Sequence, residues 1–188
     1  MPLLALLKDN WTVFAIALAE CGLTGELSVA MERTVRSKAP GDRPSFTDAM
    51  VTSPTRVLAI EAKWTEPRYP VVRKRLARTS PHANKLVQSQ DLARNRAFIT
   101  GWLDHMRPVA TIPLDLDGFQ DCVYQMVHRA ASACGACEGG RTPALAYLHF
   151  SADSLPRCAS RITQMPQYLE DLRALHQLLE AHGTFRSS

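Results

Sequence analysis

The chain has 188 residues, of which 46% are apolar and 21% are charged. This composition is typical of a globular domain with a buried core and excludes an intrinsically disordered chain. The net charge of +4 is compatible with a nucleic-acid partner but too small to indicate one by itself. The chain has five Cys, an odd count, its first apolar run is interrupted at Lys8, and no run reaches the length of a membrane span. We therefore expect a soluble, cytoplasmic protein with free thiols and no membrane partner.

Helix caps, glycines and hydrophobic periodicity predict the elements in chain order. Asn10 caps a helix over residues 11–21, and Thr24 caps a second helix that extends to about Lys38. Ser45 to Pro67 has the pattern of a β-hairpin with its turn at residues 53–56. The remaining elements are helices over 80–106, 117–133 and 166–182 and a strand over 143–151. This order predicts a single α/β domain over residues 1–188, a small central mixed sheet flanked by helices, with its core at about 24–151.

Three charged residues lie among apolar residues in the predicted hairpin. Asp48 is in the first strand, and Glu61 and Lys63 lie two residues apart on one face of the second. If the turn has an even number of residues, opposite residues have numbers that sum to 109, and Asp48 lies across from Glu61. Burying these charges without partners costs several kcal/mol. The cluster therefore indicates a metal, a substrate or an ion pair.

Two facing carboxylates favour a hard cation, Mg²⁺ or Mn²⁺, that keeps several waters. Such an ion lowers the pKa of a bound water and neutralises charge on a phosphoryl oxygen. Lys63 beside it could position the attacking water or stabilise the transition state. We therefore expect metal-assisted hydrolysis of a phosphodiester bond, with Asp48 and Glu61 as the metal ligands. The alternative is a partly buried ion pair between Lys63 and one of the two acids.

The pattern of Asp48 followed by Glu61-x-Lys63 on neighbouring strands resembles the PD-(D/E)XK nuclease superfamily, which includes restriction endonucleases and Holliday-junction resolvases. The resemblance implies a restriction-endonuclease-like fold, a DNA substrate, metal binding by Asp48 and Glu61, and assistance to the attacking water by Lys63. Two features depart from the superfamily: Thr47 stands where Pro usually precedes the Asp, and little room is left for the strand that commonly precedes the Asp-bearing one.

The resemblance leaves several properties of the protein open. A catalytically inactive nuclease-like domain that binds nucleic acid or a protein partner is the alternative to an active enzyme. Endonuclease or exonuclease action, DNA or RNA as the substrate, and the oligomeric state, a homodimer included, are not decided by the sequence.

The resemblance also implies further site residues. In many superfamily members a Glu on the first core helix completes the site, which points to Glu26 or Glu32, and Glu32 is preferred because it is closer to the hairpin. A later helix often contributes polar residues, which points to Gln125 or His128 as residues that line the site.

A basic cluster directly follows the hairpin. Its position favours contacts with nucleic-acid phosphates, although a solvated helix edge would carry the same residues. The predicted nucleic-acid-binding residues are Arg73, Lys74, Arg75 and Arg78.

Cys134 and Cys137 form a C-x-x-C pair, which is half of a zinc site. Cys122, Cys158 or Cys21 could complete such a site, but the gap from Cys137 to Cys158 does not match the spacing of a compact cluster. We therefore expect free thiols in place of a zinc or iron–sulfur site.

Overall fold

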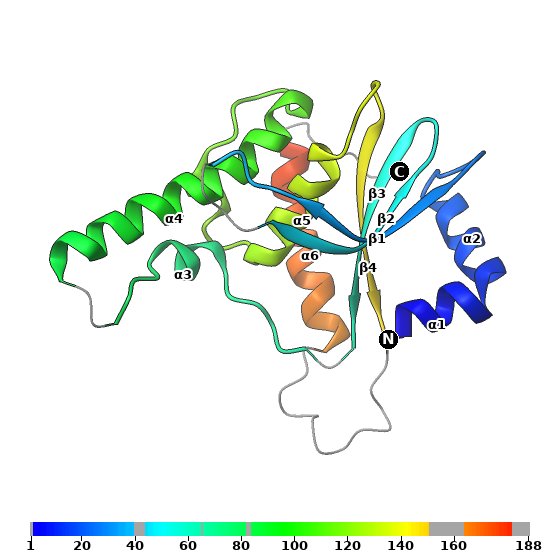
Figure 1. The fold of residues 1–188 in the computed structure, drawn as a ribbon, viewed down its shortest axis with the longest axis horizontal. Coiled ribbons are helices and arrows are strands. Elements are labelled where there is room, and N and C mark those ends of the chain that lie inside the picture. The colour runs from blue at the N-terminus through cyan, green and yellow to red at the C-terminus, as the bar shows by residue number, and fades with distance from the viewer. Residues whose placement is uncertain (1, 40–43, 65, 82–83, 151–163, 182–188) are drawn as a thin grey trace, which may run out of the picture.

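A four-stranded mixed sheet forms the centre of the protein in the computed structural model, which describes residues 2–39, 44–64, 66–81, 84–150 and 164–181 (Figure 1). The first three strands form an antiparallel meander, and the last strand is parallel to the third. In spatial order they are β1 (Ser28–Val35), β2 (Ser45–Thr52), β3 (Arg56–Lys63) and β4 (Thr142–His149). A parallel pair needs a crossover connection, and the chain between β3 and β4 supplies it as helices. These are α3 (Val72–Leu76), α4 (Lys85–Met106) and α5 (Tyr124–Gly135).

Helices cover both faces of the sheet (Figure 1). One face packs against α1 (Pro2–Asp9) and α2 (Trp11–Glu20), and the other against α5, with α4 and α6 (Met165–Ala181) beyond it. Leu58 and Ile60 of β3 are buried on the α1–α2 side, whereas Val57 and Ala59 are buried against α5. The prediction that β3 is a central strand covered on both sides is confirmed.

The predicted helix over residues 24–38 is wrong, because this segment forms β1. Seven residue pairs join β1 to β2, from Ser28↔Thr52 to Val35↔Ser45. Val29 and Met31 alternate along β1 and pack into the cluster beneath α1 and α2. The Thr24 cap and the charge pattern favoured a helix locally, and pairing with β2 outweighs that preference.

The other predicted elements are present with shifted ends. Asn84 is the N-cap of α4, accepting a hydrogen bond from the Val87 amide at 3.0 Å, so the helix does not begin at Ser80. The predicted helix over 117–133 divides into a 3-10 turn (Leu116–Phe119), which Asp115 caps by accepting from the Asp117 amide, and α5. The last strand and helix are confirmed, and their predicted ends at residues 151 and 182 lie outside the described residues. Neither helix α1 nor helix α3 is predicted from the sequence.

The chain that follows β1 docks on α4 at Gly101. A side chain at this position would place a Cβ 2.3 Å from Ser37 Oγ and 2.5 Å from the Ala39 amide nitrogen. The close approach lets Ser37 Oγ donate to the Phe98 carbonyl at 2.9 Å and the Lys38 amide donate to the Gly101 carbonyl at 3.2 Å. Glycine is therefore required where α4 meets the loop that leads into β2.

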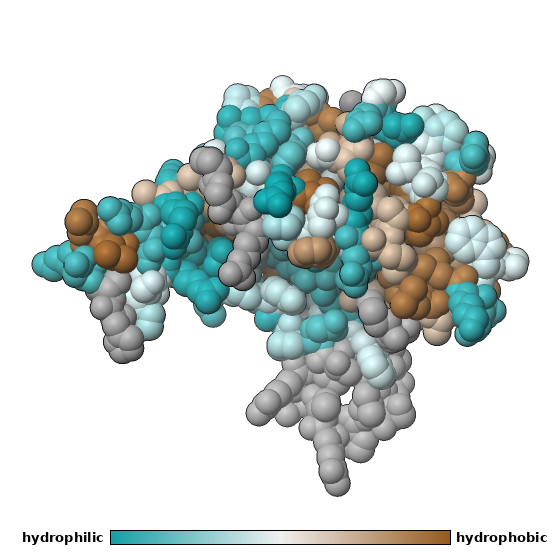
Figure 2. Space-filling model, viewed as in Figure 1, coloured by the Kyte–Doolittle hydropathy of each residue, from teal (hydrophilic) through white to brown (hydrophobic). Residues whose placement is uncertain are grey.

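Exposed apolar side chains gather over α1 and α2, at the right of Figure 2. They are Leu4, Trp11, Val13 and Ile16. Within the described ranges, no helix combines the length and the apolar character that crossing a membrane requires.

Candidate functional site

The hairpin places Asp48 beside Glu61 by its register. The pairs Ala49↔Ile60 through Thr52↔Val57 have numbers that sum to 109, as predicted for an even-length turn. Continuing that register by one pair puts Asp48 across from Glu61. Here the ladder changes, because Asp48 Oδ2 accepts the hydrogen bond from the Ala62 amide at 2.7 Å. A side-chain carboxylate thus takes the place of a backbone acceptor where the two strands part.

Glu61 is the centre of a buried polar network. Lys63 Nζ lies 2.5 Å from Oε1, and Gln125 Nε2 donates to the same oxygen at 2.7 Å. Arg129 Nε donates to Oε2. All four side chains are largely inaccessible to solvent, and the exposed fraction of Glu61 is 2%. Together with Asp48, the cluster contains two acids and two bases, so the buried charges balance and both carboxylate oxygens of Glu61 have partners.

Asp48 differs from Glu61 because it is only half-buried. Burial raises the pKa of the Asp48 carboxyl above its ordinary value. The hydrogen bond from the Ala62 amide lowers it, Glu61 raises it further, and Lys63 and Arg129 lower it. The net direction is upward, so the folded protein holds the charged form of this side chain at a cost.

Helix α5 carries two side chains to Glu61 from one of its faces. Gln125 and Arg129 are four residues apart, and this spacing places both side chains over the same stretch of β3. The structure thus brings the predicted Gln125 to Glu61, together with Arg129, which sequence reasoning missed. The i, i+4 spacing from Gln125 could have identified it.

Tyr147 is a second residue that sequence reasoning missed. It is paired with Glu61 in the β3–β4 register, and its hydroxyl is buried with no hydrogen-bond partner in the described chain. Burial raises the pKa of this phenol well above its ordinary value, and Glu61 adds to the rise. Tyr147 is therefore a neutral donor beside the acid cluster, and only the strand pairing identifies it.

His128 lies near the network but does not contact Glu61. Its Nδ1 is 3.0 Å from Ser45 Oγ, and Arg129 Nη1 donates to the same hydroxyl. Burial lowers the pKa of His128 well below its ordinary value, and the nearby cations Arg129, Lys63 and Arg75 lower it further. His128 is therefore a neutral imidazole, and Ser45 links it to the ion pair through Arg129.

The two candidate acids before the hairpin are not on a helix, so that part of the prediction is wrong. Glu26 is exposed in the loop before β1, and its neighbour Gly25 lies against Pro54 at the hairpin turn, the opposite end of the strands from Asp48. Glu32 is an exposed residue of β1 with a left-handed φ of 49°. It falls between two residues paired with β2, Met31 and Arg33, at the position across from Asp48.

The predicted basic cluster divides between two environments. Arg75 and Arg78, on and just after α3, line a pocket between α3, α4 and α5. Arg73 instead forms an exposed ion pair with Asp121, and Lys74 is exposed outside the pocket. The helical period explains the division, because successive residues of α3 face different sides.

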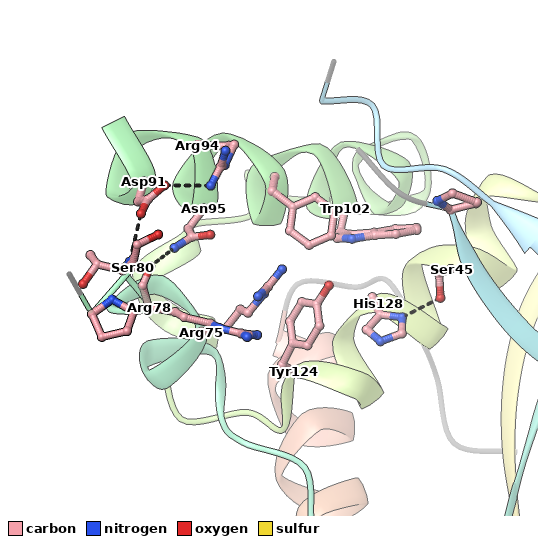
Figure 3. A pocket seen from close by; sticks show the side chains of 14 residues that line it. Ser45, Arg75, Arg78, Ser80, Asp91, Arg94, Asn95, Trp102, Tyr124 and His128 are labelled. Carbon is pink, nitrogen blue, oxygen red and sulfur yellow. Dashed lines mark hydrogen bonds and ion pairs between the residues drawn. The ribbon is translucent and has the colours of Figure 1, made fainter. Parts of the chain in front are cut away.

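The pocket has a volume of about 780 Å³ and combines basic and aromatic side chains. Arg75 and Arg78 enter from the α3 side, Trp102 from α4, and Tyr124 and His128 from α5 (Figure 3). Ser45, at the start of β2, closes one end. The pocket and the Glu61 network are therefore adjacent, since Ser45 contacts both His128 and Arg129.

Polar residues of α4 hold the chain that forms the rim of this pocket. Asn95 Nδ2 donates to the Arg78 carbonyl at 2.5 Å, and Asp91 Oδ2 accepts from the Ser80 amide at 3.0 Å. Asp91 Oδ1 also pairs with Arg94 at 2.7 Å. The spacing of Asp91 and Asn95 lets one face of α4 fix the segment that carries Arg78.

Asp48 and Glu61 are the residues with which the chain could hold a metal. Among the described residues, no group of three or more His, Cys, Asp or Glu side chains is arranged to hold one. Two carboxylates still suit an Mg²⁺ that keeps several of its waters. The Oδ1 atom of Asp48 accepts no hydrogen bond from the described chain, whereas Glu61 would have to exchange a cationic partner for the metal. The two carboxylates therefore fit such a metal ion, which would compete with Lys63 and Arg129 for Glu61.

Cys134 and Cys137 lie at the end of α5 and just after it, and both are free thiols. Cys137 Sγ donates to the Ala133 carbonyl at 3.3 Å. Cys21 is an exposed thiol at the end of α2, and Cys158 lies outside the described residues.

Comparison with known proteins gives a family and no activity. The chain belongs to the family described as domain of unknown function DUF6946, whose model matches residues 13–187. No curated protein and no solved structure matches it.

Proposed function

We propose that this protein is a metal-dependent nuclease that hydrolyses phosphodiester bonds of DNA. The observation that carries the proposal is the register of the hairpin, which, continued by one pair, puts Asp48 across from Glu61, while Lys63 contacts the Glu61 carboxylate at 2.5 Å. Two acids and an amine on adjacent central strands are the groups that metal-assisted phosphodiester hydrolysis uses.

The order of elements around the hairpin supports the same proposal. A helix, three strands, a helical crossover and a fourth strand are similar to the core of the PD-(D/E)XK superfamily. That core commonly has a strand before the Asp-bearing one, and β1 stands in that place. The strand for which the sequence leaves little room is therefore β1, which lies within the segment predicted to be a helix. A restriction-endonuclease-like fold is the finer form of this proposal.

Each residue of the cluster has a distinct part in the proposed reaction. Asp48 and Glu61 would hold Mg²⁺ or Mn²⁺, which when bound neutralises phosphoryl charge and lowers the pKa of a water ligand. Lys63 lies between Glu61 and the ring of Tyr69, with Nζ 5.3 Å from the ring centroid, and would hold the attacking water. Gln125 orients the Glu61 carboxylate.

One observation favours a second candidate, a catalytically inactive nuclease-like domain that binds nucleic acid. Arg129 and Lys63 both pair with Glu61, and with Asp48 counted the two acids balance the two cations without any metal. The alternative interpretation of the sequence is an ion pair between Lys63 and one of the two acids, and Lys63 forms such a pair with Glu61. In an inactive domain this pairing would be permanent, and the pocket beside it would bind the ligand.

Cleavage of supercoiled plasmid and of labelled oligonucleotides in Mg²⁺ or Mn²⁺, with chelator as the blank, separates the two candidates. We expect Asp48→Asn and Glu61→Gln to abolish cleavage and weaken Mn²⁺ binding in calorimetric titration. Lys63→Met should keep Mn²⁺ binding and lower the rate by about 10²–10³-fold, as the loss of one transition-state-stabilising group does. Glu26→Gln, at the far end of the hairpin, is the matched control.

Thermal melts of each variant separate loss of the site from loss of the fold. If both acid variants cleave DNA at the rate of the parent protein, the nuclease proposal is wrong. If neither the parent nor any variant cleaves DNA, and calorimetry detects no Mn²⁺ binding to the parent, the second candidate, an inactive domain that binds nucleic acid, is favoured.

A further inference from the structure

We propose that the pocket between α3, α4 and α5 binds one nucleotide of a single strand, with the phosphate on Arg75 and Arg78 and the base against the ring of Trp102. This inference rests on the proposed nuclease function for its substrate class, a nucleic-acid strand with an unpaired end. The pocket itself is argued from its own residues.

Two buried donors in the pocket have no acceptor. Arg75 Nε and Trp102 Nε1 are both buried and lack a hydrogen-bond partner in the described chain. The exposed fraction of Trp102 is only 1%. Buried polar groups are almost always satisfied, and each exception calls for a reason. A ligand with acceptor oxygens or ring nitrogens would supply both acceptors.

Aromatic contacts hold Arg75 in place without using its donors. Its guanidinium carbon lies 5.5 Å from the ring centroid of Phe98 and 5.7 Å from that of Tyr124. These cation–π contacts fix the plane of the group. The pocket's third arginine, Arg94 on α4, is paired with Asp91, so Arg75 and Arg78 provide the positive charge that remains. An anion of phosphate size fits this arrangement.

The aromatic wall favours a planar group attached to that anion. The ring centroids of Tyr124 and His128 lie 4.7 Å apart, and those of Trp102 and His128 lie 5.6 Å apart, so the three rings form one continuous cluster along the pocket. His128 is neutral because burial and neighbouring cations lower its pKa, and it adds no charge to repel or attract a base. Stacking of bases on such rings is tolerant of sequence and is a main source of affinity for single strands.

The position of the pocket connects it to the acid cluster. Ser45 lines the pocket and accepts a hydrogen bond from Arg129, which pairs with Glu61. A strand with its end nucleotide in the pocket would therefore have its next phosphates directed towards Asp48 and Glu61. A base inside a duplex is not free to enter, so the ligand is a nucleotide with an unpaired base.

Calorimetric titration with deoxyadenosine 5′-monophosphate tests the pocket without any cleavage. We expect this nucleotide to bind more tightly than inorganic phosphate or deoxyadenosine alone, because each fragment reaches only one half of the pocket. Arg75→Met and Trp102→Phe should each weaken binding by about tenfold or more. Arg107→Met, an exposed arginine paired with Asp104 outside the pocket, is the matched control.

Two further binding measurements distinguish a nucleotide at the end of a strand from a free nucleotide. A short single strand with a 5′-phosphate should compete with the mononucleotide at lower concentration, whereas a blunt duplex should not. Equal affinity for strand and mononucleotide would overturn the strand assignment in favour of a free nucleotide. Tighter binding of phosphotyrosine than of the nucleotide, or unchanged affinity in the Arg75 and Trp102 variants, would overturn the inference altogether.

The outcome can be separated from that of the nuclease proposal. Glu61→Gln should keep nucleotide binding, because Glu61 does not line the pocket. Nucleotide binding without cleavage would sustain the pocket and end the nuclease proposal, and cleavage without nucleotide binding would do the reverse. Thermal melts confirm that each variant is folded before its binding is compared.

Discussion

The acid cluster and the pocket lie side by side, and they differ in how their polar groups are satisfied. In the cluster, both oxygens of Glu61 have partners and the charges balance, and the Tyr147 hydroxyl, buried beside it without a partner in the described chain, is neutral. In the pocket, Arg75 Nε and Trp102 Nε1 are buried without acceptors, and positive charge is in excess. In a satisfied buried network no group bears the cost of lacking a partner, whereas unsatisfied buried donors cost stability until a ligand supplies acceptors. We infer that the cluster stabilises the free protein and that the pocket is maintained for a ligand.

Removal of Glu61 should have the largest effect on stability. Glu61→Ala leaves Lys63 and Arg129 buried without their shared partner. Breaking such a pair typically costs about 3–5 kcal/mol, and we expect the free energy of unfolding to fall by that amount in denaturant titration. Glu26→Ala, an exposed change, should stay within about 0.5 kcal/mol of the parent. A loss below about 1 kcal/mol for Glu61→Ala would mean that the cluster does not stabilise the fold.

Removal of the Arg75 charge should have a much smaller effect on stability. Arg75→Met keeps an apolar side chain against Phe98 and Tyr124, loses two cation–π contacts and removes a buried donor without an acceptor. These contributions oppose each other, so the free energy of unfolding should change by no more than about 1 kcal/mol. A loss as large as that for Glu61→Ala would show that Arg75 supports the fold as Glu61 does, and the contrast between the two regions would fail.

The hairpin could be predicted from the sequence because its determinants are local. The turn between the strands fixes the register, and the alternation along β3 assigns Glu61 and Lys63 to the face of Val57 and Ala59. The cluster of Asp48, Glu61 and Lys63 followed from these two features alone. Gln125 was also expected near the site, although only from a resemblance and without a stated partner.

The parts that could not be predicted depend on contacts between distant segments. Residues 24–38 carry a helix-like cap and charge pattern, and only pairing with β2 makes them a strand. Ser45 and Arg129 enter the site because the crossover brings α5 over the start of β2. The pocket needs Arg75, Trp102 and neighbouring residues from three helices that are joined by loops, so no spacing in the sequence indicates it.

We expect the smallest effect on stability at Asp48. This residue belongs to the cluster, but like the unpartnered donors of the pocket it is buried at a cost in free energy. Its folded pKa is raised, chiefly by burial, so the ionised form is disfavoured in the folded state and ionisation lowers stability. Asp48→Asn removes this charge, and an amide oxygen can still accept from the Ala62 amide. We therefore expect the variant to melt at a higher temperature than the parent at neutral pH, in the absence of metal.

The advantage of Asp48→Asn should depend on pH with a definite sign. As the pH falls from neutral through the raised pKa towards the ordinary value of 3.8, the parent binds the proton that the folded state favours, and the difference in melting temperature should shrink and then vanish. Melts from pH 7 to pH 3.5 measure it. A difference that grows on acidification would mean that the Asp48 carboxylate is stabilised in the fold. Added Mg²⁺ at neutral pH should reverse the order of the two proteins, because the metal stabilises only the parent, which retains both carboxylates.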